Sequence, residues 1–297
     1  MAGAFSRYQL DAQGQAASPA RWLALGAVVV ALLAVFVLRT SVARVAGAPR
    51  LPDLFHLAIV LGSALVLFTS YRSLTRLDWL VGLGLGFLLG LQLPFTTLFS
   101  PYPFFDLDLG EWGEAFVRGA STAVAALGGL SIARRGGPVQ LRLAAGDWRR
   151  SAASFVFGVL VGVPLAVLNM FANAWTQGRA FVWQSPLSAA LDALQPAVFE
   201  EILYRLALLG LIWFVLQRTW PSRQAAWLAG ALSLLVHTYG VHFGDEFITQ
   251  PLPTLATGAV MGLIWGLPLT VLALRRDLDS ATGFHWVQDF ARFWAGL

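Results

Sequence analysis

Apolar runs of about 20 residues, each bounded by charge, proline or glycine, follow one another along this sequence, and such a run is long enough to cross a bilayer as a helix. The clear runs are 22–38, 55–71, 79–99, 152–175, 189–216, 225–241 and 255–274. Two weaker candidates are 116–133, which is rich in Gly and Ala, and 281–294, which is short for a span. The pattern predicts an all-α protein, a polytopic transmembrane helix bundle with about eight spans.

The first run, 22–38, has two interpretations. A basic stretch precedes it, and the sequence AGA at 46–48 has the small-x-small pattern of a signal-peptide cleavage site. Against cleavage, the leader would be unusually long, and Arg39 and Arg44 lie between the run and the site. We therefore expect an uncleaved first span.

Composition supports a membrane protein. Hydrophobic residues make up 57% of the 297 residues and charged residues only 12%, which is outside the range of soluble globular domains. The sequence has no Lys, and its net charge of +4 fits basic loops facing anionic lipid better than a nucleic-acid surface. It also has no Cys, which excludes disulfides, thiolate metal sites and cysteine nucleophiles. We expect an integral, multi-pass protein of a bacterial-type cytoplasmic membrane, with bilayer lipid as a partner and no nucleic acid.

Arg residues indicate the orientation of the spans. They collect in the connecting segments 134–150, 218–223 and 275–276, which we therefore expect on the cytoplasmic side. The acidic segments 106–111 and 245–246 lack Arg and are expected outside. The segment 39–50 carries three Arg yet falls on the outer side, which conflicts with the rule unless the first run is cleaved or lies in the interface.

Three ionisable side chains lie inside the apolar run 189–216. Glu201 and Arg205 are four residues apart, so in a helix they share a face and can neutralise each other. We expect this pair to give structural support rather than to react. Glu200 is rotated by about 100° from Glu201 and has no such partner on its helix. Its carboxyl is either protonated by burial and hydrogen-bonded to a neighbouring span, or suited to act as a general base.

Further candidate residues lie on two later apolar runs. His237 is in the run 225–241, and His285 precedes Asp289 by four residues near the C-terminus. A single His on an apolar helix often has a structural role, whereas a His/Asp pair at this spacing can bind a metal or fix the tautomer of the His. Together with Glu200, these side chains are of the types that form a hydrolytic site without a Ser or Cys nucleophile.

Three motifs in this order resemble those of the CPBP family of intramembrane proteases, which includes type II CAAX prenyl endopeptidases and Abi-type bacteriocin-processing or immunity proteins. EEILYR at 200–205 looks like the EExxxR motif of the family, SLLVH at 233–237 like its second motif, and HWVQD at 285–289 like its closing HxxxN/D motif. The resemblance covers 187–297, the expected protease core. Residues 1–186 would form N-terminal transmembrane helices of variable type, in one continuous membrane domain with the core.

The resemblance implies catalytic roles for four residues. Glu200 would activate the attacking water, and His237 would help to bind and orient it. His285 and Asp289 would lie across the scissile carbonyl and stabilise the oxyanion.

Two positions depart from the family pattern. Ser233 stands where the second motif usually begins with Phe, and Asp289 stands where the last motif more often ends in Asn. An ionised Asp cannot donate a hydrogen bond to an oxyanion, so Asp289 must be protonated, orient His285 or bind a metal. The cofactor is therefore unknown: a divalent metal such as Zn is compatible with the sequence but not required by it. Its candidate ligands are Glu200, His237, His285 and Asp289.

The expected helix boundaries raise a difficulty. At about 1.5 Å per residue, they put Glu200 and His237 nearer the outer face and His285 nearer the cytoplasmic face. Straight full spans would keep the three apart. We therefore expect a misplaced boundary or a broken helix, with 262–268, which contains two Gly and a Pro, as a candidate break.

These observations favour an intramembrane peptidase that uses a glutamate-activated water to hydrolyse a peptide bond near the membrane surface. Its substrate would be a peptide or protein, prenylated (CAAX-type) or leader-bearing (bacteriocin-type). A second hypothesis is a non-catalytic membrane scaffold or immunity-type protein on the same fold, for which the departures at Ser233 and Asp289 leave room. A third is a proton-coupled transporter with Glu200, His237 and His285 as a relay, although the sequence shows no inverted repeat.

Overall fold

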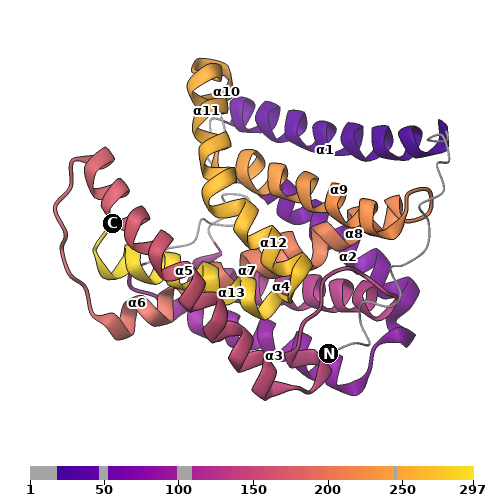
Figure 1. Cartoon of the computed structure of the whole chain (residues 1–297), viewed down its shortest axis with the longest axis horizontal. Coiled ribbons are helices and arrows are strands. Elements are labelled where there is room, and N and C mark those ends of the chain that lie inside the picture. Colours follow the sequence, from indigo (N-terminus) through magenta and orange to yellow (C-terminus); the bar gives the residue numbers. More distant parts are fainter. Residues whose placement is uncertain (1–18, 47–52, 99–108, 244–245) are drawn as a thin grey trace.

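The computed structural model describes residues 19–46, 53–98, 109–243 and 246–297, and every regular element in these ranges is a helix. Figure 1 shows that the helices cross at large angles: α9 runs nearly horizontally in this view and α11 nearly vertically. The prediction of an all-α fold is confirmed. The proposed cleavage sequence at 46–48 and the acidic segments 106–111 and 245–246 lie partly outside the described residues.

Five long helices form the N-terminal part: α1 (Pro19–Ala46), α2 (Asp53–Ser70), α3 (Arg76–Gln92), α4 (Gly110–Arg134) and α5 (Trp148–Gln177). Three short 3-10 turns flank them: η2 (Tyr71–Ser73), η3 (Leu93–Phe95) and η5 (Leu143–Ala145). The sequence fixes the start of α3 through a capping box, in which the Thr75 side chain accepts from the backbone N–H of Asp78, and the Asp78 carboxylate accepts from the backbone N–H of Thr75. Asp147 caps the start of α5 in a similar way.

The C-terminal part alternates α-helices with wider π-helical segments. Its α-helices are α6 (Pro186–Asp192), α7 (Leu194–Glu200), α8 (Leu209–Leu216), α9 (Ser222–Leu235), α10 (Glu246–Thr249), α11 (Pro251–Met261), α12 (Leu267–Arg275) and α13 (Leu278–Trp294). The π-helical segments are η6 (Glu201–Leu208), η7 (Val236–Val241) and η8 (Gly262–Gly266). Such segments are rare and occur often at functional sites.

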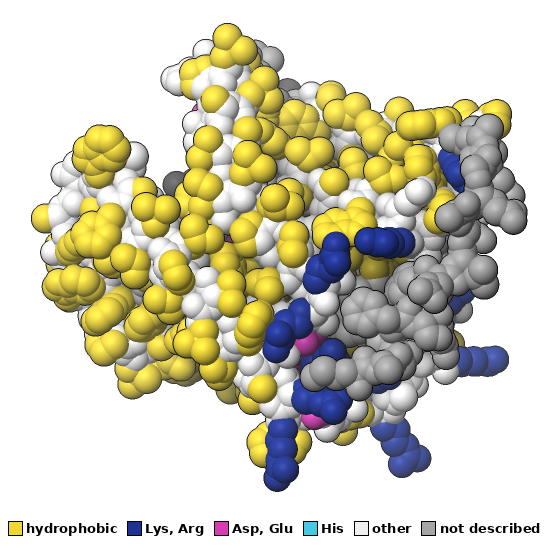
Figure 2. All heavy atoms as spheres, in the orientation of Figure 1, with side chains coloured by type: hydrophobic (Ala, Val, Ile, Leu, Met, Phe, Trp, Pro, Cys, Tyr) yellow, Lys and Arg dark blue, Asp and Glu magenta, His cyan; other side chains and the backbone are white. Residues whose placement is uncertain are grey.

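Six of the described helices are long and apolar enough to cross a membrane: Pro19–Leu38, Leu54–Ser73, Arg76–Phe95, Gly110–Arg134, Trp148–Thr176 and Pro251–Arg275. The protein is therefore an integral, multi-pass membrane protein, and hydrophobic side chains cover most of the face in Figure 2. The expected runs 189–216, 225–241 and 281–294 are not among these helices. The first is divided among α6, α7, η6 and α8, so the count of about eight spans stays a prediction.

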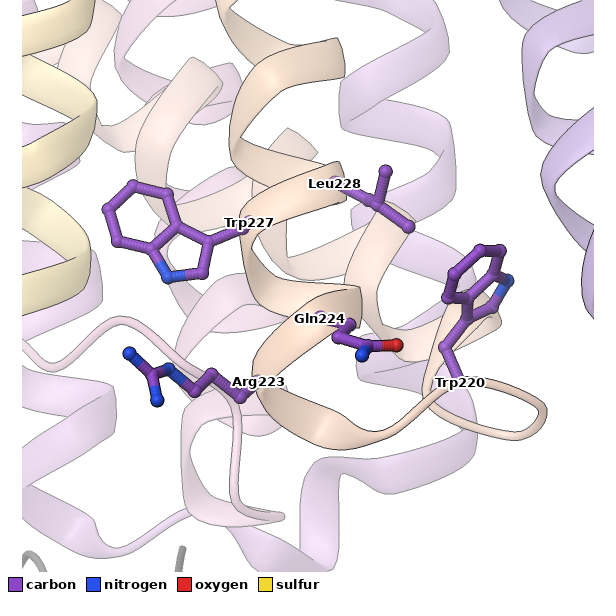
Figure 3. A pocket seen from close by; sticks show the side chains of 5 residues that line it. All are labelled: Trp220, Arg223, Gln224, Trp227 and Leu228. Atoms are coloured by element: carbon purple, nitrogen blue, oxygen red, sulfur yellow. The ribbon is translucent and has the colours of Figure 1, made fainter. Parts of the chain in front are cut away.

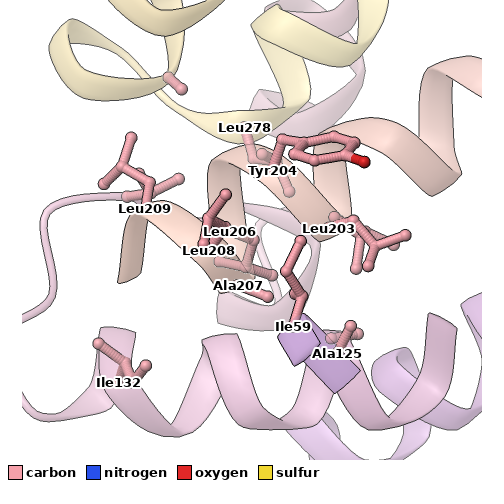
Figure 4. Packing of buried hydrophobic residues seen from close by; sticks show 14 of the residues in the cluster. Ile59, Ala125, Ile132, Leu203, Tyr204, Leu206, Ala207, Leu208, Leu209 and Leu278 are labelled. Atoms are coloured by element: carbon pink, nitrogen blue, oxygen red, sulfur yellow. The ribbon is translucent and has the colours of Figure 1, made fainter. Parts of the chain in front are cut away.

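The core of the molecule is built around η6. All eight residues of this segment are buried, and they pack against α2, α4 and α9. Figure 4 shows Leu203 and Ala207 of η6 above Ala125 and Ile132 of α4. The segment that carries Glu201 and Arg205 is thus enclosed by other helices rather than by lipid.

Helix α13 packs most extensively on α5, and small residues let the two backbones approach. A methyl group added at Gly158 of α5 would overlap the carbonyl oxygen of Ser280, and one added at Gly283 of α13 would overlap that of Phe155. Glycine is required here because it leaves space, not because of its backbone angles. This contact fixes α13, and with it His285, against the rest of the bundle.

Arg side chains gather at one end of the molecule, at the lower right of Figure 2. Arg134 pairs with Asp78 at 2.8 Å, and Arg142 pairs with Asp277 at 3.2 Å. The first residues of α1 lie beside the α8–α9 connection, since the Nε atom of Arg21 donates to the carbonyl of Thr219 at 2.9 Å. Residues 39–46 therefore form the opposite end of α1, and the conflict of the segment 39–50 with the positive-inside rule persists.

Candidate functional site

Glu200 is the last residue of α7, and its partner comes from a neighbouring helix. Its Oε2 atom lies 2.8 Å from Nε2 of His237, which is the second residue of η7. The Glu200 side chain is 22% exposed, so a small molecule can reach it. A partner on another helix could not be recognised from spacing along 189–216.

Arg205 sets the tautomer of His237. Its Nη1 atom lies 2.7 Å from Nδ1 of His237, and because a guanidinium can only donate, Nδ1 must accept. The imidazole proton is therefore on Nε2, and it is donated to Glu200 Oε2. Tyr204 stacks on the same imidazole with ring centroids 4.3 Å apart, which holds the ring plane.

The predicted ion pair between Glu201 and Arg205 is present, with Nη1 and Oε1 3.4 Å apart. Both side chains are buried, at 0% and 1% exposure. Oε1 of Glu201 also accepts a hydrogen bond from Nδ1 of His285 at 2.9 Å. The pair therefore contacts both histidines, His237 through its arginine and His285 through its glutamate.

His285 lies between three carboxylates. Nδ1 faces Glu201, while Nε2 lies 3.3 Å from Oδ2 of Asp289 and 3.7 Å from Oε2 of Glu200. Carboxylate oxygens accept hydrogen bonds, so both ring nitrogens must carry a proton if the carboxylates are ionised. The arrangement therefore favours a His285 imidazolium, with Nε2–H directed toward the side of Glu200.

Asp289 is bound by an arginine that the sequence analysis did not identify. Oδ1 of Asp289 accepts from Nη2 of Arg292 at 2.9 Å, and Arg292 follows Asp289 by three residues on α13. Of the three roles considered for Asp289, orientation of His285 fits this geometry. The i, i+3 spacing of an Asp and an Arg was the signal in the sequence.

Four predicted residues, Glu200, His237, His285 and Asp289, are therefore brought together. The expected separation rested on straight and parallel spans, but the helices are steeply inclined to one another (Figure 1), and π-helical segments adjoin Glu200 and include His237. The helix does not break at 262–268 as predicted. It widens into the π-helical segment η8 and then continues as α12 to Arg275.

Ser233 has a structural partner. It is buried on α9, and its hydroxyl donates to the backbone carbonyl of Tyr204 at 2.5 Å. This bond ties α9 to η6 one turn from His237. A Phe at this position could not make the bond, so the departure from the family pattern is matched by a local contact.

The donor set does not fit a metal ion in this arrangement. To bind a metal through Nε2, His237 would have to move its proton to Nδ1, where it would face the N–H of Arg205. His285 meets carboxylates at both nitrogens. Within the described ranges, no group of three or more His, Asp or Glu side chains has the arrangement of a metal site.

The C-terminal part of the chain matches a known protein family. Residues 182–291 match the family model described as type II CAAX prenyl endopeptidase Rce1-like. This segment belongs to the Rce1-like family. The match contains all four site residues and confirms the resemblance that the motifs indicated. No curated protein and no solved structure matches the chain.

The match of residues 182–291 to the Rce1-like family implies a peptidase by class.

Proposed function

We propose that the protein is an intramembrane endopeptidase in which Glu200 acts as the general base toward a water molecule. The observation that carries this proposal is the convergence on one Glu200 oxygen of His237 Nε2 at 2.8 Å and His285 Nε2 at 3.7 Å. Peptide hydrolysis requires a base, a donor that orients the base and a donor for the oxyanion. Glu200, His237 and His285 can fill these three roles.

The reaction begins when the Glu200 carboxylate takes a proton from water while the water oxygen attacks the scissile carbonyl carbon. The carbonyl oxygen becomes an oxyanion and accepts a hydrogen bond from Nε2–H of His285. When the tetrahedral intermediate collapses, the C–N bond breaks and Glu200 returns the proton to the leaving amine. The two products are a carboxylic acid and an amine.

His237 and Asp289 position the reacting groups. The N–H of His237 holds the Glu200 carboxylate, which leaves the other carboxylate oxygen available to the water. Asp289, paired with Arg292, favours the imidazolium form of His285 and orients its ring. Because both Asp289 oxygens already face donors on Arg292 and His285, His285 rather than Asp289 supplies the hydrogen bond to the oxyanion.

The test is cleavage of a peptide panel by the purified full chain, with products identified by mass spectrometry. We expect Glu200→Gln to lower kcat by about 10² to 10⁴ and His285→Gln by about 10² to 10³, with small changes in KM. Glu111→Gln, an exposed glutamate at the start of α4, is the matched control and should retain full activity.

The same panel addresses substrate class. Prenylated CAAX peptides would be compared as free acids and as C-terminal amides, beside leader-bearing peptides in which the cleaved bond is internal. CAAX-type processing requires preference for the free acid, and leader-type processing requires none. If Glu200→Gln and His285→Gln both cleave at the wild-type rate, the mechanism assigned to these residues is wrong. If the wild type cleaves no peptide of the panel, the scaffold and transporter hypotheses return.

A further inference from the structure

A cavity of about 660 Å³ lies at the beginning of α9, away from Glu200. It is lined by Trp220, Arg223, Gln224, Trp227 and Leu228. Figure 3 shows the two indole rings on either side of the helix, with the Arg223 side chain extending beside Trp227. The catalytic proposal uses none of these residues.

The lining of the cavity carries a positive charge and no acidic residue. Arg223 is exposed and makes no hydrogen bond or ion pair with any residue of the described ranges. The guanidinium of Arg275 stacks over the ring of Trp227, 5.2 Å from its centroid. Between Glu201 and Asp245 the sequence contains no Asp or Glu. An anionic ligand would therefore meet Arg223 in the lining and Arg275 beside Trp227, on a wall that is otherwise apolar except for Gln224.

The level of the cavity relative to the bilayer follows from its contact with α1. Trp22 lies near the start of the apolar span Pro19–Leu38, and its ring meets that of Trp220 edge-on at 5.5 Å. The Nε1 atom of Trp220 donates to the carbonyl of Arg21 at 3.1 Å. Trp and Arg at the end of a span are typical of the membrane interface, so the cavity opens where lipid headgroups lie.

We propose that this cavity binds an anionic phospholipid, with the phosphate on Arg223 and Arg275 and the glycerol and upper acyl chain against Trp220, Trp227 and Leu228. Basic pockets between helices on the Arg-rich side of a membrane protein suit such headgroups. The site is separate from the proposed peptidase chemistry. A lipid bound here would bridge α1 and the α8–α9 connection, and α9 leads directly into η7, which carries His237.

The experiment is native mass spectrometry of the purified full chain with added phosphatidylglycerol, phosphatidylcholine or inorganic phosphate. We expect one phosphatidylglycerol to be retained in preference to phosphatidylcholine. Arg223→Gln and Arg275→Gln should each weaken its binding about fivefold. The matched control is Arg149→Gln, since Arg149 also stacks on a tryptophan, Trp148, but lies outside the cavity. Far-UV circular dichroism verifies that each variant is folded.

Equal retention of phosphatidylglycerol by Arg223→Gln and Arg149→Gln would overturn the proposal. Equal retention of phosphatidylcholine and phosphatidylglycerol by the wild type would also overturn it, because the arginines would then not favour the anionic headgroup. Displacement of the lipid by millimolar inorganic phosphate would assign the cavity to a free anion instead.

Discussion

Replacing Arg205 with Met tests how strongly the buried charges hold the site together. Arg205 and Glu201 are 1% and 0% exposed, so the substitution leaves the Glu201 carboxylate in the core with His285 as its remaining charged partner. Removing one member of a buried pair typically destabilises a protein by about 3–5 kcal/mol. Because His285 stays 2.9 Å away, we expect the lower end, about 3 kcal/mol.

The assay is reversible unfolding in mixed micelles, with two comparisons. Arg150→Met is the matched surface control, since Arg150 pairs with Asp147 but is 75% exposed; it should lie within about 0.5 kcal/mol of the wild type. The double variant Glu201→Gln/Arg205→Met should be more stable than Arg205→Met by about 1 kcal/mol or more, because Gln can still accept from His285 without a buried charge. The reasoning is refuted if Arg205→Met unfolds like Arg150→Met, or if the second substitution lowers stability further.

Three further predictions concern the metal question, helix packing and pH. Since His237 presents an N–H rather than a lone pair to Glu200, activity should survive prolonged treatment with a strong chelator; loss on chelation and recovery with Zn²⁺ would contradict the tautomer assigned here. Gly158→Ala should lower the free energy of unfolding by about 1–3 kcal/mol through overlap with α13, whereas Gly84→Ala in α3, which meets no neighbouring atom, should be neutral or slightly stabilising in the same assay. Burial raises the pKa of the Asp279 carboxyl despite three hydrogen bonds that lower it. The folded state therefore holds that proton more tightly, and the wild type loses stability as pH rises from 3.8 through the folded pKa. The stability of Asp279→Asn relative to the wild type should therefore increase over that interval in unfolding experiments at a series of pH values, and a constant difference would contradict the assignment.

Local spacing predicted those features of the site that lie on one helix. The pairing of Glu201 with Arg205, and the shared face of His285 and Asp289, follow from positions four residues apart. The long apolar runs likewise indicated the membrane-spanning helices, because length and hydropathy alone decide whether a helix can cross. These features depend on neighbours within a turn or two of the chain.

The features that could not be predicted depend on how the helices cross. The contact of Arg205 with His237 joins residues 32 positions apart, and that of Glu201 with His285 joins residues 84 apart. Counting rise per residue assumed straight α-helices perpendicular to the membrane, whereas η6 and η7 are π-helical at the site. The tautomer of His237 could not be predicted either, since it is decided by the Arg205 guanidinium, which lies on another helix.

The charges of the site explain why so many ionisable groups can lie within an apolar bundle. Glu201, Asp289 and Glu200 contribute three negative charges, and Arg205, Arg292 and the His285 imidazolium contribute three positive ones. Glu201 and Asp289 each contact an arginine, at 3.4 Å and 2.9 Å. Glu200 instead contacts two histidines, and in the proposed mechanism it is the carboxylate that gains and loses a proton. The arginines thus lie beside the two carboxylates that take no part in the proposed proton transfer, and the carboxylate proposed to change its charge is held by histidines.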